Sequence, residues 1–342
     1  MNTGKSVRKK FLSKGPKIVA IGGGTGLSIL LRGMKEYTSN ITAIVTVADD
    51  GGGSGILRED LDMLPPGDIR SCILALANTE PTMARLLQYR FKEGSLKGQN
   101  FGNLFIAAMN EIYGSFEVAV RETCNVLAVT GKVLPVTLEK VKLHAVLKNG
   151  EKVHGESNIP LINKAMSSQI DHVYIEPEIS FPMKEAIDAI EEADAIVLGP
   201  GSLYTSVIPN LLIKDMADTI SAADGIKIYI SNVMTQPGET DGYSLWDHVN
   251  AIIYHSREDL IDYVIANVEE IPEETLKKYS EDGATPVIFS KEDEEKLNSI
   301  GIGIIKENLI DIKKNYIRHD SIKLCEIITR IAKEKRAKKA FD

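Results

Sequence analysis

The stretch KIVAIGGGTGLSILLRGMK, residues 17–35, decides the fold class of this chain. Residues 17–21 form a short apolar run rich in β-branched side chains, which predicts a buried strand. A glycine-rich turn follows at 22–26, and apolar side chains then recur at the spacing of a helix face. Strand, glycine turn and helix in this order predict the first unit of an α/β sheet.

The same alternation continues along the chain. Further strands are predicted over 41–48, 172–176, 195–199 and 227–231, and later apolar runs lie at 262–268, 286–289 and 302–305. Helices are predicted over 68–78, with Asp68 as the cap, and over 182–192, 245–255 and 320–337. We therefore predict an α/β fold: a Rossmann-like, doubly wound, mostly parallel sheet.

Two segments are predicted to interrupt this sheet. Residues 80–130 form a helical insertion, with a turn at 100–103 and apolar faces that include Leu104, Ala108 and Ile112. Residues 133–160 form a β-hairpin region, because apolar residues alternate over 141–147 and Asn149-Gly150 follows. The predicted domain plan is a basic tail at 1–16, one α/β domain over 17–330 and a basic tail at 331–342.

Composition and charge exclude several classes of protein. The chain has 342 residues, 43% hydrophobic and 26% charged, as soluble globular proteins do. The net charge is −8, yet both ends are basic, so the body is strongly acidic. An acidic body argues against nucleic-acid binding, and the basic ends leave a membrane-surface or partner contact open.

The cysteines and the apolar runs bear on the compartment. The three cysteines, Cys72, Cys124 and Cys325, are far apart and show no metal-binding spacing, which favours three buried thiols in a reducing compartment. No secretory signal and no run long enough to span a membrane are recognised. We expect a cytoplasmic protein without a transmembrane segment.

The first glycine turn is the strongest candidate for a binding site. Backbone N–H groups of a glycine turn, together with the positive end of the helix that follows, form an anion site that suits phosphate. The turn is not a P-loop, which needs a lysine, and Leu27 stands where the dinucleotide fingerprint has its last glycine. The candidate residues here are Gly22, Gly23, Gly24, Thr25 and Gly26.

The segment ADDGGGSGILRE, residues 48–59, follows the second predicted strand. Asp49 and Asp50 are placed to accept hydrogen bonds from ribose or sugar hydroxyls. Two carboxylates repel a nearby phosphate unless a metal ion or an arginine intervenes, and Arg58 is the candidate counter-charge. The glycines at 51–53 and 55 form a possible second anion-binding nest, and the candidate residues here are Gly52, Gly53 and Ser54.

Other candidates follow later strands or lie at loop ends. GPGS at 199–202 comes directly after a predicted strand, and Ser202 is placed to cap a helix and to meet a phosphate or hydroxyl. Because ligands of open α/β sheets bind at the carboxyl ends of the strands, we expect the glycine motifs to share one crevice. The remaining candidates are Gly199, Gly201, Tyr204, Asp68, Arg70, Asn100, Asn103 and Asn232.

The sequence assigns no catalytic residue. None of the six histidines shows a metal-binding spacing, and we interpret them as structural or surface residues with no metal site. The nucleophile elbow GxSxG is absent, and no residue stands out as a general base. Whether the protein is an enzyme stays open from the residues alone.

Taken together, the motifs resemble a known family. These are IGGGTGLSILLRGMK, TVADDGGGSGILRE, PPGDIRSCILALAN, NFGN, VLGPGSLYTSVIPNLL, SNVMTQPGETDGY and YIRHD. Over about residues 17–330 the sequence is similar to the bacterial gluconeogenesis factor (YvcK) family of the CofD-like superfamily. The resemblance implies a cytoplasmic, Rossmann-like protein that binds UDP-sugars, notably UDP-N-acetylglucosamine. It also implies a regulatory role in gluconeogenic growth, carbon metabolism, cell-wall (peptidoglycan) synthesis and cell shape, with no established catalysis.

The resemblance also implies two ligand-binding residues near the C-terminus. These are Arg318 in the RHD motif at 318–320 and, less directly, Tyr279 in KKYSEDGATPV. An arginine can hold a diphosphate with two hydrogen bonds, and a tyrosine ring can stack on uracil.

Two alternatives remain open at this point. The related CofD transferases move a phospholactyl group with magnesium, so the first alternative is a magnesium-dependent transferase that uses Asp49 and Asp50. The second is an NAD-binding protein, because an acid after the second strand suits a ribose. The expected partner is a nucleotide sugar; a homodimer and protein partners in wall or carbon regulation are further possibilities.

Overall fold

The computed structural model describes residues 15–313 and 316–339. Nearly all of the predicted basic tail at 1–16, and residues 340–342 of the second tail, lie outside these ranges.

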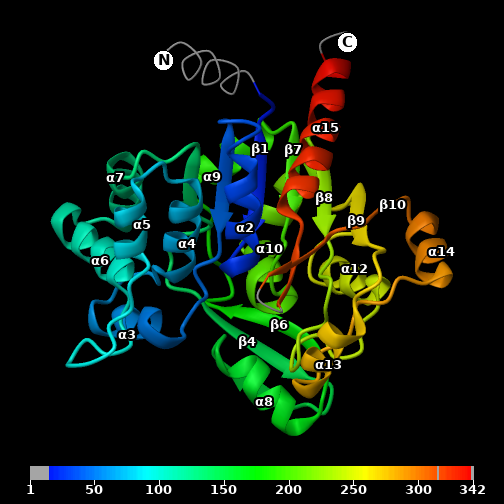
Figure 1. The fold of residues 1–342 in the computed structure, drawn as a ribbon, viewed down its shortest axis with the longest axis horizontal. Coiled ribbons are helices and arrows are strands. Elements are labelled where there is room, and N and C mark those ends of the chain that lie inside the picture. Colours follow the sequence, from blue (N-terminus) through cyan, green and yellow to red (C-terminus); the bar gives the residue numbers. More distant parts are fainter. Residues whose placement is uncertain (1–14, 314–315, 340–342) are drawn as a thin grey trace.

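A seven-stranded sheet forms the centre of the molecule (Figure 1). Its order is β10-β9-β8-β7-β1-β2-β3, and all neighbouring strands pair in parallel. Every residue of β1 and β7 is buried, as expected for strands covered on both faces. This confirms the predicted α/β fold with a mostly parallel sheet. The strands are β1 Ile18–Gly22, β2 Ile41–Val45, β3 Lys132–Pro135, β7 Ala195–Leu198, β8 Ile226–Ile230, β9 Tyr263–Asn267 and β10 Gly303–Glu307.

Helices flank this sheet (Figure 1). α2 packs against α4 and α15, and α15 approaches so closely that a Cβ on Gly33 would lie 2.9 Å from Cys325 Sγ. The flanking helices are α2 Gly24–Met34, α3 Gly52–Asp60, α4 Gly67–Leu76, α9 Lys184–Glu191, α10 Ile208–Leu211, α11 Met216–Ala222, α12 Leu245–Tyr254, α13 Glu273–Glu281, α14 Lys291–Ser299 and α15 Ser321–Lys339. The predicted C-terminal tail at 331–342 therefore begins inside α15.

The segment predicted as a helical insertion contains α5 Pro81–Leu87, α6 Phe101–Tyr113 and α7 Phe116–Val126. The turn predicted at 100–103 is instead the start of α6, where the Asn100 side chain accepts a hydrogen bond from the Asn103 N–H. Ile112, predicted on an apolar face, is 72% exposed. Its spacing was helical, but the last turn of α6 extends beyond the core that covers the first turns.

A second, three-stranded antiparallel sheet lies below the carboxyl ends of the central strands in Figure 1. It contains β4 Lys142–Leu147, β5 Lys152–His154 and β6 Ile170–Glu176, with α8 Asn158–Met166 beside it. The Asn149-Gly150 hairpin is confirmed, and Gly150 has the positive φ of 86° that such a turn requires. The strand predicted at 172–176 was assigned to the α/β alternation, but it pairs with β4 in the second sheet. The prediction of its place was wrong because periodicity does not reveal which strand is the partner.

Two further differences concern short segments. Residues at the start of the predicted hairpin region form β3 and belong to the central sheet. The apolar run at 286–289 forms only isolated bridges, Met234 with Pro286 and Ser244 with Ile288. A small hairpin, β11 Ile310–Lys313 and β12 Tyr316–His319, precedes α15.

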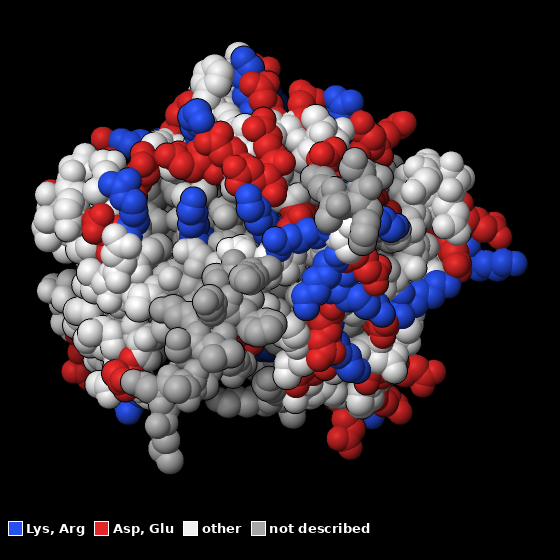
Figure 2. All heavy atoms as spheres, turned by 90° about the horizontal axis from the view of Figure 1, so that it is seen from above, with Lys and Arg blue, Asp and Glu red and all other residues white. Residues whose placement is uncertain are grey.

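Figure 2 views the edge of the sheet at which the strands begin. Acidic and basic side chains are interspersed over the coloured part of this face. Within residues 15–313 and 316–339, no helix is both long and apolar enough to cross a lipid bilayer.

Candidate ligand-binding site

The carboxyl ends of the central strands border a cavity of about 380 Å³. It joins five separate parts of the sequence: the turn after β1, the turn after β7, the loop after β8, α13 and β12. Its lining holds one arginine and one histidine and no aspartate or glutamate. The lining residues are Gly23, Gly24, Thr25, Gly26, Pro200, Gly201, Ser202, Ser206, Asn232, Val233, Met234, Gln236, Tyr279, Ile317, Arg318 and His319.

The first glycine turn contributes the start of α2. The helix begins at Gly24, whose φ of 65° lies in the left-handed region that glycine tolerates best. N–H groups in the first turn of a helix have no partner within the helix. The Gly24 N–H donates to the Asp68 carboxyl, and no partner for the N–H groups of Thr25 and Gly26 is found in the described part of the chain. These two donors are available to an anion.

The second glycine turn lies directly against the first. A Cβ placed on Gly26 would lie 2.5 Å from the Pro200 carbonyl oxygen, so the two backbones approach to a distance that only glycine allows. Ser202 precedes a π-helical turn, η1 Leu203–Val207. The predicted side-chain cap by Ser202 is not formed; its hydroxyl accepts a hydrogen bond from Gln236 Nε2 at 2.7 Å.

Arg318 reaches the cavity from β12. No hydrogen bond or ion pair of its guanidinium is found among residues 15–313 and 316–339. The hydroxyl of Tyr279, on α13, accepts the Ile317 N–H at 2.7 Å, so this tyrosine holds the strand residue next to Arg318. On its other side, His319 Nε2 donates to the Ser231 carbonyl at 2.9 Å, and burial lowers the pKa of this histidine. A neutral His319 therefore anchors β12 to the end of β8.

A smaller cavity of about 180 Å³ adjoins the first. The two share Thr25, Gly26, Pro200 and residues 317–319, and the smaller one adds the apolar side chains Ile29, Leu30 and Leu324. The combined space thus offers peptide N–H donors and a cation beside an apolar wall.

The acidic loop after β2 does not line this cavity. Asp50 accepts the N–H groups of Glu156 and Ser157 at 3.1 and 2.9 Å, and Asp49 accepts the Gly51 N–H at 3.0 Å. Asp50 therefore holds the loop to the start of α8, and Asp49 bonds within the loop itself. Gly52, Gly53 and Ser54 lie at the start of α3, and a Cβ on Gly53 would meet the Gln99 side chain.

The carboxyl groups around this loop resist ionisation. Burial raises the pKa of Asp49. Burial, followed by the charge of Asp49, raises the pKa of Asp68 to about 6. Burial, followed by the charges of Asp49 and Asp50, raises the pKa of Glu156 to about 8. Since Asp68 also touches the Gly23–Gly24 turn, this acidic region lies directly behind the cavity wall.

The remaining predicted site residues have structural contacts. Arg58 donates to the carbonyls of Val47 and Val141, so it is not directed at the cavity. Asp68 lies inside the first turn of α4 and does not cap it by its side chain. Arg70 packs its aliphatic carbons against the start of α6 near Gly102.

The last three predicted site residues, Asn100, Asn103 and Tyr204, are buried. The Asn103 side chain donates to Ser54, and Asn100 caps α6. The Tyr204 ring points to the other side of η1, where its hydroxyl lies 2.7 Å from that of Tyr243. The structure therefore brings together nine predicted residues, namely Gly23, Gly24, Thr25, Gly26, Gly201, Ser202, Asn232, Tyr279 and Arg318. Gly22 and Gly199 lie directly beneath them at the strand ends.

Sequence reasoning did not select Gln236, Ser206 or His319, which also line the cavity. Gln236 lies in the motif SNVMTQPGETDGY and His319 in the RHD motif, so the motifs contained the signal. The motifs do not indicate in which direction each side chain points.

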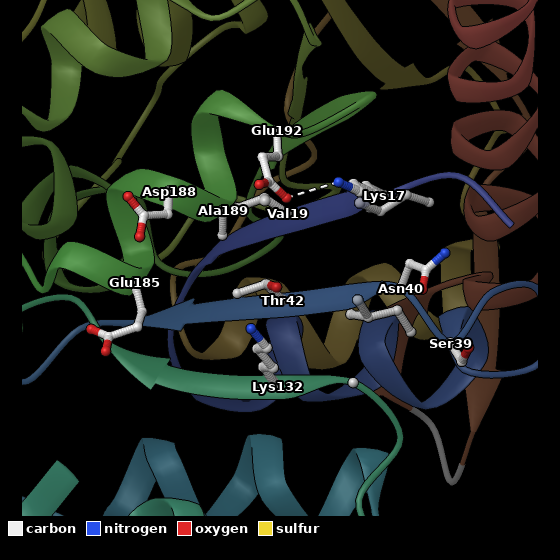
Figure 3. A pocket seen from close by; sticks show the side chains of 13 residues that line it. Lys17, Val19, Ser39, Asn40, Thr42, Lys132, Glu185, Asp188, Ala189 and Glu192 are labelled. Atoms are coloured by element: carbon white, nitrogen blue, oxygen red, sulfur yellow. Dashed lines mark hydrogen bonds and ion pairs between the residues drawn. The ribbon is translucent and has the colours of Figure 1, made fainter. Parts of the chain in front are cut away.

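A larger cavity of about 490 Å³ lies at the opposite end of the sheet (Figure 3). Lys17, Asn40 and Lys132 lie at the beginnings of their strands, and Glu185, Asp188 and Glu192 face them from α9. Lys17 Nζ and Glu192 already form an ion pair of 2.8 Å. None of the glycine turns reaches this cavity, so we do not assign the ligand site to it.

The magnesium alternative needs a set of oxygen ligands. In the described part of the chain, no group of three or more His, Cys, Asp or Glu side chains is arranged to hold a metal ion. Asp49 and Asp50 already accept backbone N–H groups, so part of their capacity as oxygen ligands is used within the protein.

An open parallel sheet with glycine turns and a cavity at the carboxyl edge of its strands is the arrangement of a Rossmann-like α/β protein. The family model for 2-phospho-L-lactate transferase CofD matches residues 18–310. This chain belongs to the CofD family, within the group whose members are named gluconeogenesis factor.

Three relatives illustrate the similarity. A putative gluconeogenesis factor of Thermoanaerobacterium thermosulfurigenes is 59% identical over 92% of this chain and 96% of its own length. The gluconeogenesis factor of Bacillus subtilis (strain 168) is 47% identical over 93% of this chain and 99% of its own length. A crystal structure of a Bacillus halodurans protein has a TM-score of 0.88 at 43% identity, over 92% of this chain and 99% of that one.

Proposed function

We propose that this protein is a cytoplasmic regulatory factor that binds a nucleotide sugar of the UDP-N-acetylglucosamine type. In this proposal the diphosphate lies in the cavity at the carboxyl edge of the sheet, and ligand binding serves gluconeogenic growth, wall synthesis and cell shape. The physiological part is supported by relatives named gluconeogenesis factor and by the resemblance of the motifs.

One observation carries the binding proposal. Arg318 and the two glycine turns line the same cavity, and no aspartate or glutamate lines it. Free N–H donors at the start of α2 and a guanidinium suit the oxygens of a diphosphate. The apolar side cavity and the Tyr279 ring offer surfaces for a base or an acetyl group.

Thermal unfolding with UDP-N-acetylglucosamine tests the proposal. A ligand that binds the native state at about 100 times its Kd adds about 2.7 kcal/mol to the free energy of unfolding, which raises the midpoint by several degrees. Arg318→Ala should weaken binding about 10- to 100-fold, because charged hydrogen bonds are lost. Arg330→Ala, an exposed arginine on α15, is the matched control.

Either of two results would refute the binding proposal. One is the absence of any midpoint change at millimolar UDP-N-acetylglucosamine. The other is an equal change in the parent protein and in Arg318→Ala, because the ligand would then lie elsewhere.

Transferase activity is the second candidate, because the matched family model is that of a phospholactate transferase. Product formation from phosphorylated donors with magnesium would support it, and loss of that product in Asp50→Asn would place the reaction near the acidic loop. For NAD, the acids after β2 already accept backbone N–H groups, and competition between NAD and the UDP-sugar tests whether both use the cavity.

A further inference from the structure

A second polar cavity, of about 290 Å³, lies between β6 and α12. Its lining shares no residue with the candidate site. The two sites nevertheless lie on either side of the same π-helical turn: Ser206 of η1 lines the first, and Tyr204 of η1 lines the second. π-Helical turns occur frequently at functional sites.

Aromatic rings form much of the second cavity. Tyr204, Tyr243, Tyr254 and His255 all line it, and neighbouring rings meet edge to face at centroid distances of 5.2–6.2 Å. Tyr254 is 66% exposed, so one ring stands at the rim in contact with solvent. Such walls bind the apolar faces of sugars and attract cations through the ring faces.

Hydrogen bonds of His255 fix the position of one side of the cavity. His255 Nδ1 donates to the Ala251 carbonyl at 2.7 Å, and its Nε2 accepts the Val173 N–H at 3.0 Å. Both ring nitrogens are therefore used, and the imidazole is neutral in this arrangement. The imidazole therefore ties the end of α12 to β6 and fixes one wall of the cavity.

The Tyr204–Tyr243 pair offers one O–H beyond the hydrogen bond that joins the two residues. The hydroxyl oxygens of Tyr204 and Tyr243 lie 2.7 Å apart, so one donates to the other and the second O–H remains. In the described part of the chain no further partner of either hydroxyl is found. Tyr243 is half-buried and lines the cavity, so this remaining O–H is a donor that a ligand in the cavity can accept.

The charged residues that line the cavity indicate which charge a ligand should carry. Asp171 and Asp247 both line the cavity, and one cation, Lys148, lies at its rim, where its Nζ is held by Gln169 Oε1 at 2.7 Å. Asp171 bonds His172 through Oδ2, and Asp247 accepts the Ser244 N–H through Oδ2. Among the residues that the structure describes, no hydrogen bond to the other carboxylate oxygen of either residue is found, so that oxygen can accept one from a ligand.

We infer that this cavity is a second binding site, for a small polyhydroxylated amine such as an amino sugar. The ammonium group pairs with the carboxylates of Asp171 and Asp247, a hydroxyl accepts the free proton of the tyrosine pair, and the rings cover the apolar face. The volume of about 290 Å³ is smaller than that of the first cavity and suits a small ligand.

A ligand-detected NMR titration at pH 6.5 tests the inference, with glucosamine as the probe and glucose as its neutral counterpart. Glucosamine should bind about tenfold or more tightly than glucose, because only its ammonium forms charged hydrogen bonds. Asp171→Asn should weaken glucosamine binding about fivefold or more, and Tyr254→Ala should weaken both sugars. Asp188→Asn, an exposed acid on α9, is the matched control.

Several outcomes would overturn the inference. These are equal binding of glucose and glucosamine, no saturable binding of glucosamine, and an unchanged affinity in Asp171→Asn. Displacement of glucosamine by UDP-N-acetylglucosamine, or its loss in Arg318→Ala, would assign the amine to the first cavity instead. Asp171→Asn and Tyr254→Ala should keep the thermal midpoint of the parent protein, which separates lost binding from lost folding.

Discussion

Tyr279 illustrates how one hydroxyl group can position a binding residue. Its ring lines the candidate site, and its oxygen accepts the N–H of Ile317, the residue before Arg318. In Tyr279→Phe the ring remains and this hydrogen bond is lost. We expect the affinity for UDP-N-acetylglucosamine to fall about 3- to 10-fold, since a net hydrogen bond contributes about 0.5–1.5 kcal/mol. Calorimetric titration measures the change.

The control for this variant is Tyr316→Phe. Tyr316 is 52% exposed and lies outside the cavity. Lys278 Nζ lies 3.8 Å from the centre of its ring. If Tyr279→Phe binds as tightly as the parent protein, the hydroxyl does not position Arg318, and only stacking by the ring would remain.

Glu239 gives a prediction for the pH dependence of stability. Its carboxyl is buried behind η1 and accepts the Thr205 hydroxyl, and burial raises its pKa to about 7 from an ordinary value of 4.5. The folded state thus holds this proton more tightly than the unfolded state. The free energy of unfolding therefore falls as the pH rises from about 4.5 to about 7, and the cost persists above that range.

Glu239→Gln removes the titration. Relative to the parent protein, this variant should gain stability between pH 5 and pH 8, by up to about 3 kcal/mol. Urea unfolding at both pH values measures the difference, with Glu258→Gln, an exposed position, as the control. A difference that stays the same at pH 5 and pH 8 would show that Glu239 is ionised throughout.

At the scale of elements, the start of α2 and the turn after β7 form one unit. A Cβ at Gly26 would meet the backbone of Pro200 at 2.5 Å, and a backbone carbonyl cannot move aside as a side chain can. Gly26→Ala should therefore push the two turns apart. We expect a loss of about 1–3 kcal/mol in the free energy of unfolding, together with weaker binding of the UDP-sugar.

Gly22→Ala is the matched control, because a Cβ there has no neighbour nearer than 3.8 Å. Urea unfolding and ligand titration of both variants measure the effects. Equal behaviour of the two variants would mean that the close approach of these turns does not matter for folding or binding.

At the scale of the whole molecule, the candidate site joins segments almost 300 residues apart. A ligand in the cavity should slow hydrogen exchange at the start of α2 and in β12 together, because it contacts both. Amides of β4, which lie outside the cavity, should exchange at the same rate with and without ligand. Hydrogen-exchange mass spectrometry measures this, and protection confined to one of the two segments would contradict a shared site.

The architecture followed largely from local patterns. The strand, turn and helix of residues 17–35 and the hairpin at Asn149-Gly150 are encoded by residues close together in the chain. The glycines of the two turns that meet at Gly26 and Pro200 are likewise visible in the local sequence. These features depend on backbone conformation and on burial periodicity, which neighbouring residues decide.

Long-range packing decided the rest. The antiparallel pairing of β6 with β4 depends on register between distant segments, as does the position of β3 in the central sheet. Only packing turned Arg58 and Tyr204 away from the cavity and placed Gln236 inside it. Residue type states what a side chain can do, but its direction and its neighbours are set by contacts that form when the whole chain folds.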